Sequence, residues 1–348
     1  MSDIAKIDKN FKIETKIERP GLLMRSIDED CFSLHGVFWE NNRYRRMPEG
    51  VAESVSEGVG YLHTHTAGGR IRFVTDSEYV VVNVILSNIN KMSHFPLSGS
   101  AGVDVYADGI YAATIMPTFD FEDRYEGVVD FGEKKLRAIT INMPTYSGVS
   151  NFCVGLNENA AVYKADPYKI EKPVVFYGSS ITQGGCVSRP GMTYESILSR
   201  KLDFDYINLG FSGNARGEKE MAEYIADLDM SVFVYDYDHN APSVEHLEAT
   251  HEPFFKLIRE KNPDLPVIFM SRPKYYLTEV EIERKNIIEK TYNNAVNNGD
   301  ENVYFIDGTT LMNDEICENG TVDGCHPTDL GFFSMAKRIM PLLEKILK

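Results

Sequence analysis

Polar residues from distant parts of the chain could together transfer an acyl group. Ser180 lies in the segment Gly-Ser-Ser-Ile-Thr at 178–182, and Asp323 and His326 belong to the segment Asp-Gly-Cys-His. A serine hydroxyl is a poor nucleophile at neutral pH unless a base accepts its proton. His326 can accept this proton, and Asp323 can hold the imidazole in the required tautomer. We therefore predict that Ser180, His326 and Asp323 form a catalytic group.

The tetrahedral intermediate of such a reaction carries a negative oxygen that needs fixed hydrogen-bond donors. Three groups could supply them: the backbone amides of Ser180 and Gly213 and the side-chain carboxamide of Asn240. Glycine at 213 would also let the backbone approach the ligand closely. Asn214 is the alternative donor to Asn240.

Two more polar residues could contact a substrate, and each has a structural alternative. His239 directly precedes Asn240, and a hydrogen-bonded structural histidine would look the same in the sequence. Arg272 could hold a substrate oxygen or simply neutralise an acidic rim. The five cysteines form no Cys-x-x-Cys pair, so no metal site is predicted from them. The expected chemistry needs no cofactor.

The second part of the chain predicts the elements that must position these residues. Five apolar runs alternate with helical patterns, which is typical of a parallel, doubly wound sheet flanked by helices. The expected strands are 174–177, 206–211, 232–237, 267–270 and 303–306, and the expected helices are about 194–202, 218–228, 244–261, 279–296 and 330–347. Ligands of such sheets bind past the carboxyl ends of the strands. The candidate residues follow those ends.

The first part of the chain is rich in short β-type runs instead. Examples lie at 71–74, 79–86, 103–106, 110–115 and 136–142, with turn residues between them. Asp108-Gly109 predicts a hairpin, because a type I′ turn needs positive φ at both positions. We expect an all-β, jelly-roll-like sandwich over residues 1–165. The polar, proline-bracketed segment 166–173 is the expected linker, and the parallel-sheet domain then spans 174–348.

Composition excludes several classes of function. The 348 residues carry a net charge of −16 without a basic run, so we expect no nucleic-acid or anionic-membrane partner. No stretch approaches the ~18–20 apolar residues of a membrane span, and the charged N-terminus lacks the apolar core of a secretory signal. The odd number of scattered cysteines favours a reducing cytoplasm. A homo-oligomer is left open.

The same residues resemble the sequence blocks of SGNH hydrolases, the GDSL esterase/lipase superfamily. The segment 178–182 is similar to the first block and 208–213 to the second, while Asn240 stands in the third and Asp323–His326 in the last. Two departures occur: Ser179 replaces the usual Asp, and Asp-His-Asn-Ala at 238–241 replaces Gly-x-Asn-Asp. The resemblance covers about residues 172–348 and implies a five-stranded, flavodoxin-like sheet with Ser180 as nucleophile. The first part resembles the β-sandwich that precedes the catalytic domain of several bacterial carbohydrate O-acetyl esterases.

Together, the chemistry and the resemblance imply a serine esterase that works through an acyl-enzyme. We expect it to remove an acetyl group from a carbohydrate or another small polar ester. Two other functions remain open: an acyltransferase that uses the same residues, and a non-enzymatic carbohydrate-binding protein. A lipase for long acyl chains is less favoured, because no amphipathic lid is evident in the sequence.

Overall fold

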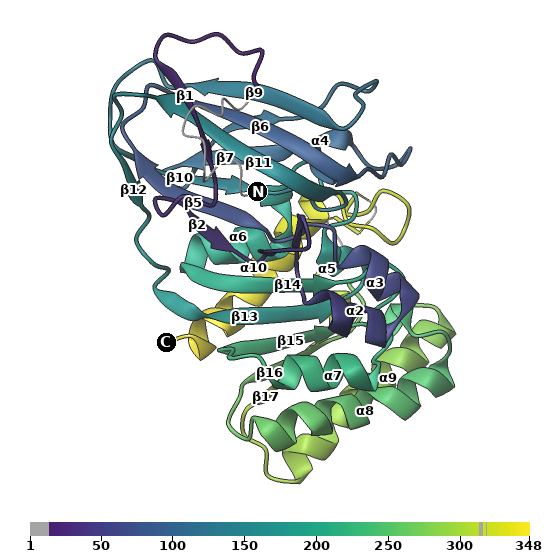
Figure 1. The fold of residues 1–348 in the computed structure, drawn as a ribbon. Coiled ribbons are helices and arrows are strands. Elements are labelled where there is room, and N and C mark those ends of the chain that lie inside the picture. Colours follow the sequence, from purple (N-terminus) through teal and green to yellow (C-terminus); the bar gives the residue numbers. More distant parts are fainter. Residues whose placement is uncertain (1–13, 313–315, 318) are drawn as a thin grey trace. The chain divides into compact units, whose positions relative to one another are not determined.

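The computed structural model describes residues 14–312, 316–317 and 319–348, which divide into two compact units (Figure 1). The first unit contains the described residues up to Arg46 together with Thr64–Pro167 and Arg189–Gly191. The second contains Met47–His63, Tyr168–Ser188 and Met192–Lys348. Residues 47–63 therefore belong to the second unit although they lie within the first part of the sequence, and residues 189–191 belong to the first unit although they lie within the second part. Strand β13 begins at Ile170, inside the segment 166–173 that the sequence suggested as a linker.

The first unit is built from antiparallel strands, as the fold class predicted. One sheet has the order β1-β11-β6-β9, and the other has the order β12-β5-β10-β7-β8, with β2 beside β5. Their bounds are β1 Leu22–Ser26, β2 Ser33–His35, β5 Arg70–Thr75, β6 Tyr79–Asn88, β7 Val103–Ala107, β8 Ile110–Ile115, β9 Arg124–Asp130, β10 Arg137–Asn142, β11 Gly148–Asn157 and β12 Val162–Lys164. A short ribbon, β3 Phe38–Glu40 with β4 Arg43–Arg45, and helix α4 Leu97–Ser100 complete the unit.

Apolar side chains at alternate positions of these strands form the core of the first unit. Ile71, Phe73, Val82 and Phe152 are fully buried and belong to one apolar cluster, because every second side chain of a strand points to the same face. The expected hairpin joins β7 to β8, and its two turn residues both have positive φ, 51° at Asp108 and 75° at Gly109.

The second unit contains a five-stranded parallel sheet with the order β14-β13-β15-β16-β17. The strands are β13 Ile170–Gly178, β14 Phe204–Gly210, β15 Val232–Asp236, β16 Val267–Met270 and β17 Val303–Ile306. The helices are α2 Glu49–Val55, α3 Glu57–Leu62, α5 Ser180–Gln183, α6 Tyr194–Leu202, α7 Lys219–Ala226, α8 Val244–Lys261, α9 Glu279–Asn297 and α10 Asp329–Ile346, with 3₁₀ turns η2 Asp238–Asn240 and η3 Gly308–Thr310. Another 3₁₀ turn, η1 Pro190–Met192, is divided: its first two residues are assigned to the first unit and Met192 to the second. The predicted sheet and its flanking helices are confirmed.

The centre of this sheet is apolar on both faces, as expected of a parallel sheet covered by helices. Aromatic side chains of the central strands stack on α8, and the rings of Tyr177 and Phe254 lie 5.2 Å apart. Helices α2 and α3 add Ala52, Val59 and Leu62 to the same cluster, which is why this early segment belongs to the second unit. Among the described residues, no helix is long and apolar enough to cross a membrane.

Candidate active site

The candidate nucleophile lies at a tight turn from strand to helix. Strand β13 ends at Gly178, and the side chain of Ser179 caps α5 by accepting a hydrogen bond from the amide of Ile181 at 3.1 Å. Ser180 is the first residue of this four-residue helix. The turn fixes the backbone of Ser180 at the carboxyl edge of the sheet, where the hydroxyl can meet residues from other loops.

The structure brings Ser180, His326 and Asp323 together in one chain of hydrogen bonds. The hydroxyl oxygen of Ser180 lies 2.9 Å from Nε2 of His326, and Nδ1 of His326 lies 2.8 Å from Oδ2 of Asp323. The other oxygen of Asp323 accepts the backbone amides of His326 at 2.8 Å and Cys325 at 3.0 Å. Partial burial alone would raise the pKa of Asp323, but these donors outweigh it and lower the pKa to about 2. Asp323 is therefore a charged partner for the imidazole.

The predicted oxyanion donors lie on loops that follow three adjacent strands. Gly178 of β13 pairs with Gly210 of β14 and with Asp236 of β15, so the loops after these residues leave the sheet at one level. Gly213, in the loop after β14, has a φ of 67°, a left-handed conformation that suits glycine. The carboxamide nitrogen of Asn240 donates to the carbonyl of Phe211 at 3.1 Å. Its second hydrogen is available for another acceptor.

Asn214, the alternative donor, has a different role. Its carboxamide nitrogen donates to the carbonyl of Ser212 at 2.7 Å. A Cβ added to Gly58 of α3 would lie 2.0 Å from its side-chain oxygen, so the carboxamide packs closely against that helix. Asn240 therefore remains the candidate oxyanion donor, and Asn214 fixes the turn that carries Gly213.

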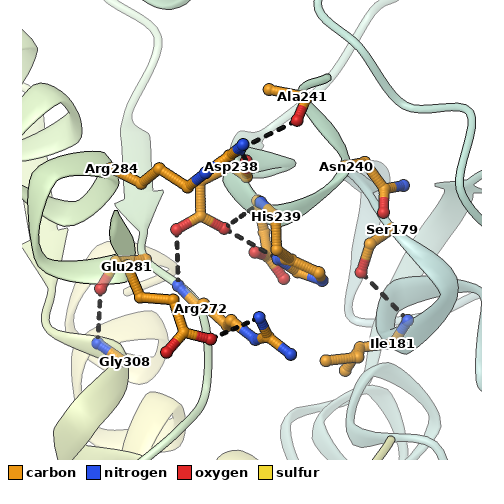
Figure 2. A network of polar contacts seen from close by, with 12 residues as sticks. Ser179, Ile181, Asp238, His239, Asn240, Ala241, Arg272, Glu281, Arg284 and Gly308 are labelled. Atoms are coloured by element: carbon orange, nitrogen blue, oxygen red, sulfur yellow. Dashed lines mark hydrogen bonds and ion pairs between the residues drawn. The ribbon is translucent and has the colours of Figure 1, made fainter. Parts of the chain in front are cut away.

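His239 and Arg272 belong to a network of polar contacts around Asp238 (Figure 2). Nδ1 of His239 lies 2.8 Å from Oδ1 of Asp238, and the backbone amide of Arg272 donates to Oδ2 of Asp238 at 3.0 Å. Burial would raise the pKa of Asp238, but hydrogen bonds from His239 and Arg272 outweigh it and keep the pKa below its usual value. The guanidinium of Arg272 forms an ion pair with Glu281 at 2.6 Å, so it already has a carboxylate partner.

Two buried acids near the nucleophile helix were missed in the sequence. Oδ2 of Asp236 lies 3.5 Å from the hydroxyl of Thr182 in α5, and Glu195 of α6 is fully buried. Burial raises the pKa of Glu195 to about 8 and that of Asp236 well above its usual value. Acidic residues in a strand and in the first turn of a helix usually face solvent, so no sequence pattern marked these two.

One group in the second unit has residue types that could bind a metal. Single ligand atoms of Asp236, Asp238 and His239 all lie within 4.8 Å of one another. Both oxygens of Asp238 already accept hydrogen bonds, from His239 and from Arg272. We therefore assign this group to hydrogen bonding.

Comparison with known proteins covers both parts of the chain. Residues 171–344 match the model of the GDSL-like Lipase/Acylhydrolase family, and residues 25–162 match the model described as the N-terminus of Esterase_SGNH_hydro-type. No curated protein matches the chain.

Solved structures resemble most of the chain. A GDSL-like lipase from Bacteroides ovatus is 29% identical with a TM-score of 0.84, covering 94% of this chain and 98% of that one. The salicylyl-acyltransferase SsfX3 from a tetracycline biosynthetic pathway is 21% identical with a TM-score of 0.78 and the same coverage. A family two carbohydrate esterase from Clostridium thermocellum, solved with cellohexaose, is 14% identical with a TM-score of 0.60, covering 91% of this chain and 99% of that one.

Proposed function

Since this chain belongs to the GDSL-like lipase/acylhydrolase family, we propose that it is a serine esterase that removes a small acyl group, foremost acetyl, from a carbohydrate or similar polar alcohol. The contact between Ser180 and His326 at 2.9 Å carries this proposal, because it gives the hydroxyl a base within hydrogen-bond reach. The similarity to a carbohydrate esterase supports the polar alcohol.

In the first half of the proposed reaction, an acyl-enzyme forms. Oγ of Ser180 attacks the ester carbonyl carbon while Nε2 of His326 takes the hydroxyl proton, and the carbonyl π electrons move onto the oxygen. Donors from Ser180, Gly213 and Asn240 stabilise this oxyanion. The oxyanion then collapses, the ester C–O bond breaks, and His326 returns the proton to the leaving alcohol.

In the second half, water replaces the alcohol. His326 takes a proton from the water, whose oxygen attacks the acyl carbon of the ester on Ser180. Collapse of the second intermediate releases the carboxylic acid and returns the proton to Ser180. Asp323 stabilises the imidazolium that forms in each half, since its carboxylate accepts from Nδ1.

An acyltransferase is the second candidate, because the chain is similar in fold to SsfX3. The same acyl-enzyme would then be resolved by an alcohol. The two functions differ in their products, so we propose to measure free acid and new ester with and without added polyols. Acid formation that is unaffected by polyols supports the hydrolase, whereas acyl flux diverted into new esters supports the transferase.

The serine mechanism itself is tested with p-nitrophenyl acetate. We expect Ser180→Ala to lower kcat by about 10⁴-fold or more. The matched control is Ser231→Ala, which removes a hydroxyl next to the opposite end of β15 and should leave kcat within about twofold of wild type. Equal rates for wild type and Ser180→Ala would exclude Ser180 as the nucleophile.

A further inference from the structure

The imidazole of His239 is held firmly although the proposed reaction does not use it. Nδ1 lies 2.8 Å from the carboxylate of Asp238, and the side chain is only 6% exposed. The backbone around it is fixed as well, because the guanidinium of Arg284 donates to the carbonyls of Asp238 and Ala241. Figure 2 shows these contacts on one side of the imidazole.

The other ring nitrogen of His239, Nε2, is buried and lacks a hydrogen-bond partner among the described residues. Buried polar atoms in proteins almost always have a partner, since an unpaired one lowers the free energy of unfolding. The anionic carboxylate of Asp238 favours the tautomer with the proton on Nδ1, so Nε2 presents a lone pair and can accept a hydrogen bond.

His239 lies at the same edge of the sheet as the candidate nucleophile. His239 and Asn240 lie in η2, directly after β15, and β15 pairs with β13, the strand before Ser180. Figure 2 shows the ring on Asp238, with the turn at Ser179 and Ile181 in the same view. On another side of the network, the positive charge of Arg272 acts on the thiol of Cys325, the neighbour of His326, and opposes the rise in its pKa that burial causes.

We infer that His239 determines substrate specificity by accepting a hydrogen bond at Nε2 from a hydroxyl group of the alcohol part of the ester. The site would then prefer esters of polyhydroxy alcohols, such as partly acetylated sugars, over esters of simple alkyl alcohols. This inference rests on the proposed esterase function and names the substrate class of that same site. A substrate without the hydroxyl leaves Nε2 buried and unpaired, and is discriminated against for that reason.

The test compares two esters that differ only in the hydrogen-bond donor, 2-hydroxyethyl acetate and 2-methoxyethyl acetate. We expect wild type to show a kcat/KM about tenfold higher for the hydroxyethyl ester, the size of one net hydrogen bond. His239→Phe removes Nε2 and should bring the ratio of the two kcat/KM values close to one. The matched control, His35→Phe in β2 of the first unit, should keep the wild-type ratio.

A wild-type ratio near one, or a ratio that His239→Phe leaves unchanged, would overturn the inference. Failure of this inference can be told apart from failure of the proposed esterase function. If the esterase function is wrong, wild type will not hydrolyse p-nitrophenyl acetate either. If His239→Phe does not fold, His239→Gln replaces it. Gln offers an acceptor in a different place, so we expect a reduced ratio, and an unchanged one contradicts the inference.

The inference would also be overturned if EDTA abolished the activity of wild type and zinc restored it, while zinc failed to restore activity in the His239 variant. Nε2 would then bind a metal ion together with Asp236. We expect EDTA to leave the kcat/KM ratio of wild type unchanged.

Discussion

At the scale of single residues, Asp323 gives His326 its orientation. One carboxylate oxygen accepts from the imidazole and the other accepts from two backbone amides. The backbone amides of the loop therefore fix the carboxylate of Asp323, and this carboxylate fixes the orientation of the His326 imidazole. Asp323 is 39% exposed at its side chain, so its effect comes from geometry and tautomer selection more than from a strong field, which solvent would screen.

We expect Asp323→Asn to lower kcat for p-nitrophenyl acetate by about 10²–10⁴-fold, since an amide can stabilise the wrong imidazole tautomer. Asp229→Asn, at an exposed ion pair with Lys172, is the control and should retain wild-type kcat. Because the pKa of Asp323 is about 2, its carboxylate stays charged above about pH 4, so protonation of Asp323 should not limit kcat of wild type between pH 5 and 8. A kcat of Asp323→Asn within twofold of wild type would remove Asp323 from the mechanism.

Glu195 makes the stability of the second unit depend on pH. Burial raises its pKa from 4.5 to about 8, so between these values the folded protein binds a proton that the unfolded chain does not. The contribution of Glu195 to the free energy of unfolding is therefore greatest below about pH 4.5 and is lost as the pH rises to about 8. We expect the urea midpoint of Glu195→Gln to approach that of wild type at pH 5 and to exceed it increasingly up to pH 9. Parallel pH profiles of the two midpoints would contradict this.

The sequence was sufficient to predict some residues of the candidate site, but it could not predict the contacts of others. Ser180, Asp323 and His326 carry chemistry in short local segments, and the structure brings them together. The direction of the Asn214 carboxamide depends on Gly58, which lies far away in the chain. The ion pair between Arg272 and Glu281 also arises only from folding.

At the scale of elements, helices α2 and α3 support the loop that carries Gly213. Gly58 of α3 has no side chain, and the carboxamide of Asn214 occupies the space where a Cβ would lie. Asn214 in turn holds the carbonyl of Ser212. A helix pair near the start of the chain thus positions one of the proposed oxyanion donors.

We expect Gly58→Ala to displace Asn214 and to lower kcat by about 10-fold or more, through a misplaced Gly213 amide. Gly50→Ala in α2 is the control, because nothing lies within 4 Å of its added Cβ and alanine favours a helix. That control should keep kcat and raise the melting temperature slightly. Equal kcat for both folded variants would show that α3 does not position the loop.

Element prediction succeeded where the sequence pattern was long or strongly apolar. The observed α6, α8, β16 and β17 have the predicted bounds, because helical periodicity and bare apolar runs are local signals. Helices α2 and α3 have only seven and six residues, too few for a clear period, and their burial depends on the distant sheet. Helix α5 is shorter still, and its position follows from the Ser179 cap.

At the scale of the whole molecule, the change from a β-rich to an alternating pattern was enough to predict two kinds of architecture. It could not predict that residues 47–63 and 189–191 cross between the units, because those assignments depend on packing over long distances. The net charge of −16 also acts over long distances, and it should attract cationic solutes more than anionic ones.

We therefore expect the kcat/KM for the cationic ester acetylthiocholine to fall several-fold between about 10 and 150 mM salt, as the screening length shrinks from roughly 30 Å to 8 Å. The kcat/KM for neutral p-nitrophenyl acetate should stay constant and serves as the control. A rate for the cationic ester that is constant or rises with salt would show that local charges, rather than the net charge, govern its approach.

The central claim is that Ser180 carries the acyl group during turnover. Its most direct test is rapid acid quenching of the enzyme with p-nitrophenyl acetate, followed by peptide mass spectrometry. We predict an acetyl group on Ser180 at short reaction times, absent from Ser180→Ala and increased in His326→Gln if deacylation slows more than acylation. An acetyl group at another residue that forms and disappears at the rate of turnover, with Ser180 unmodified, would contradict the account.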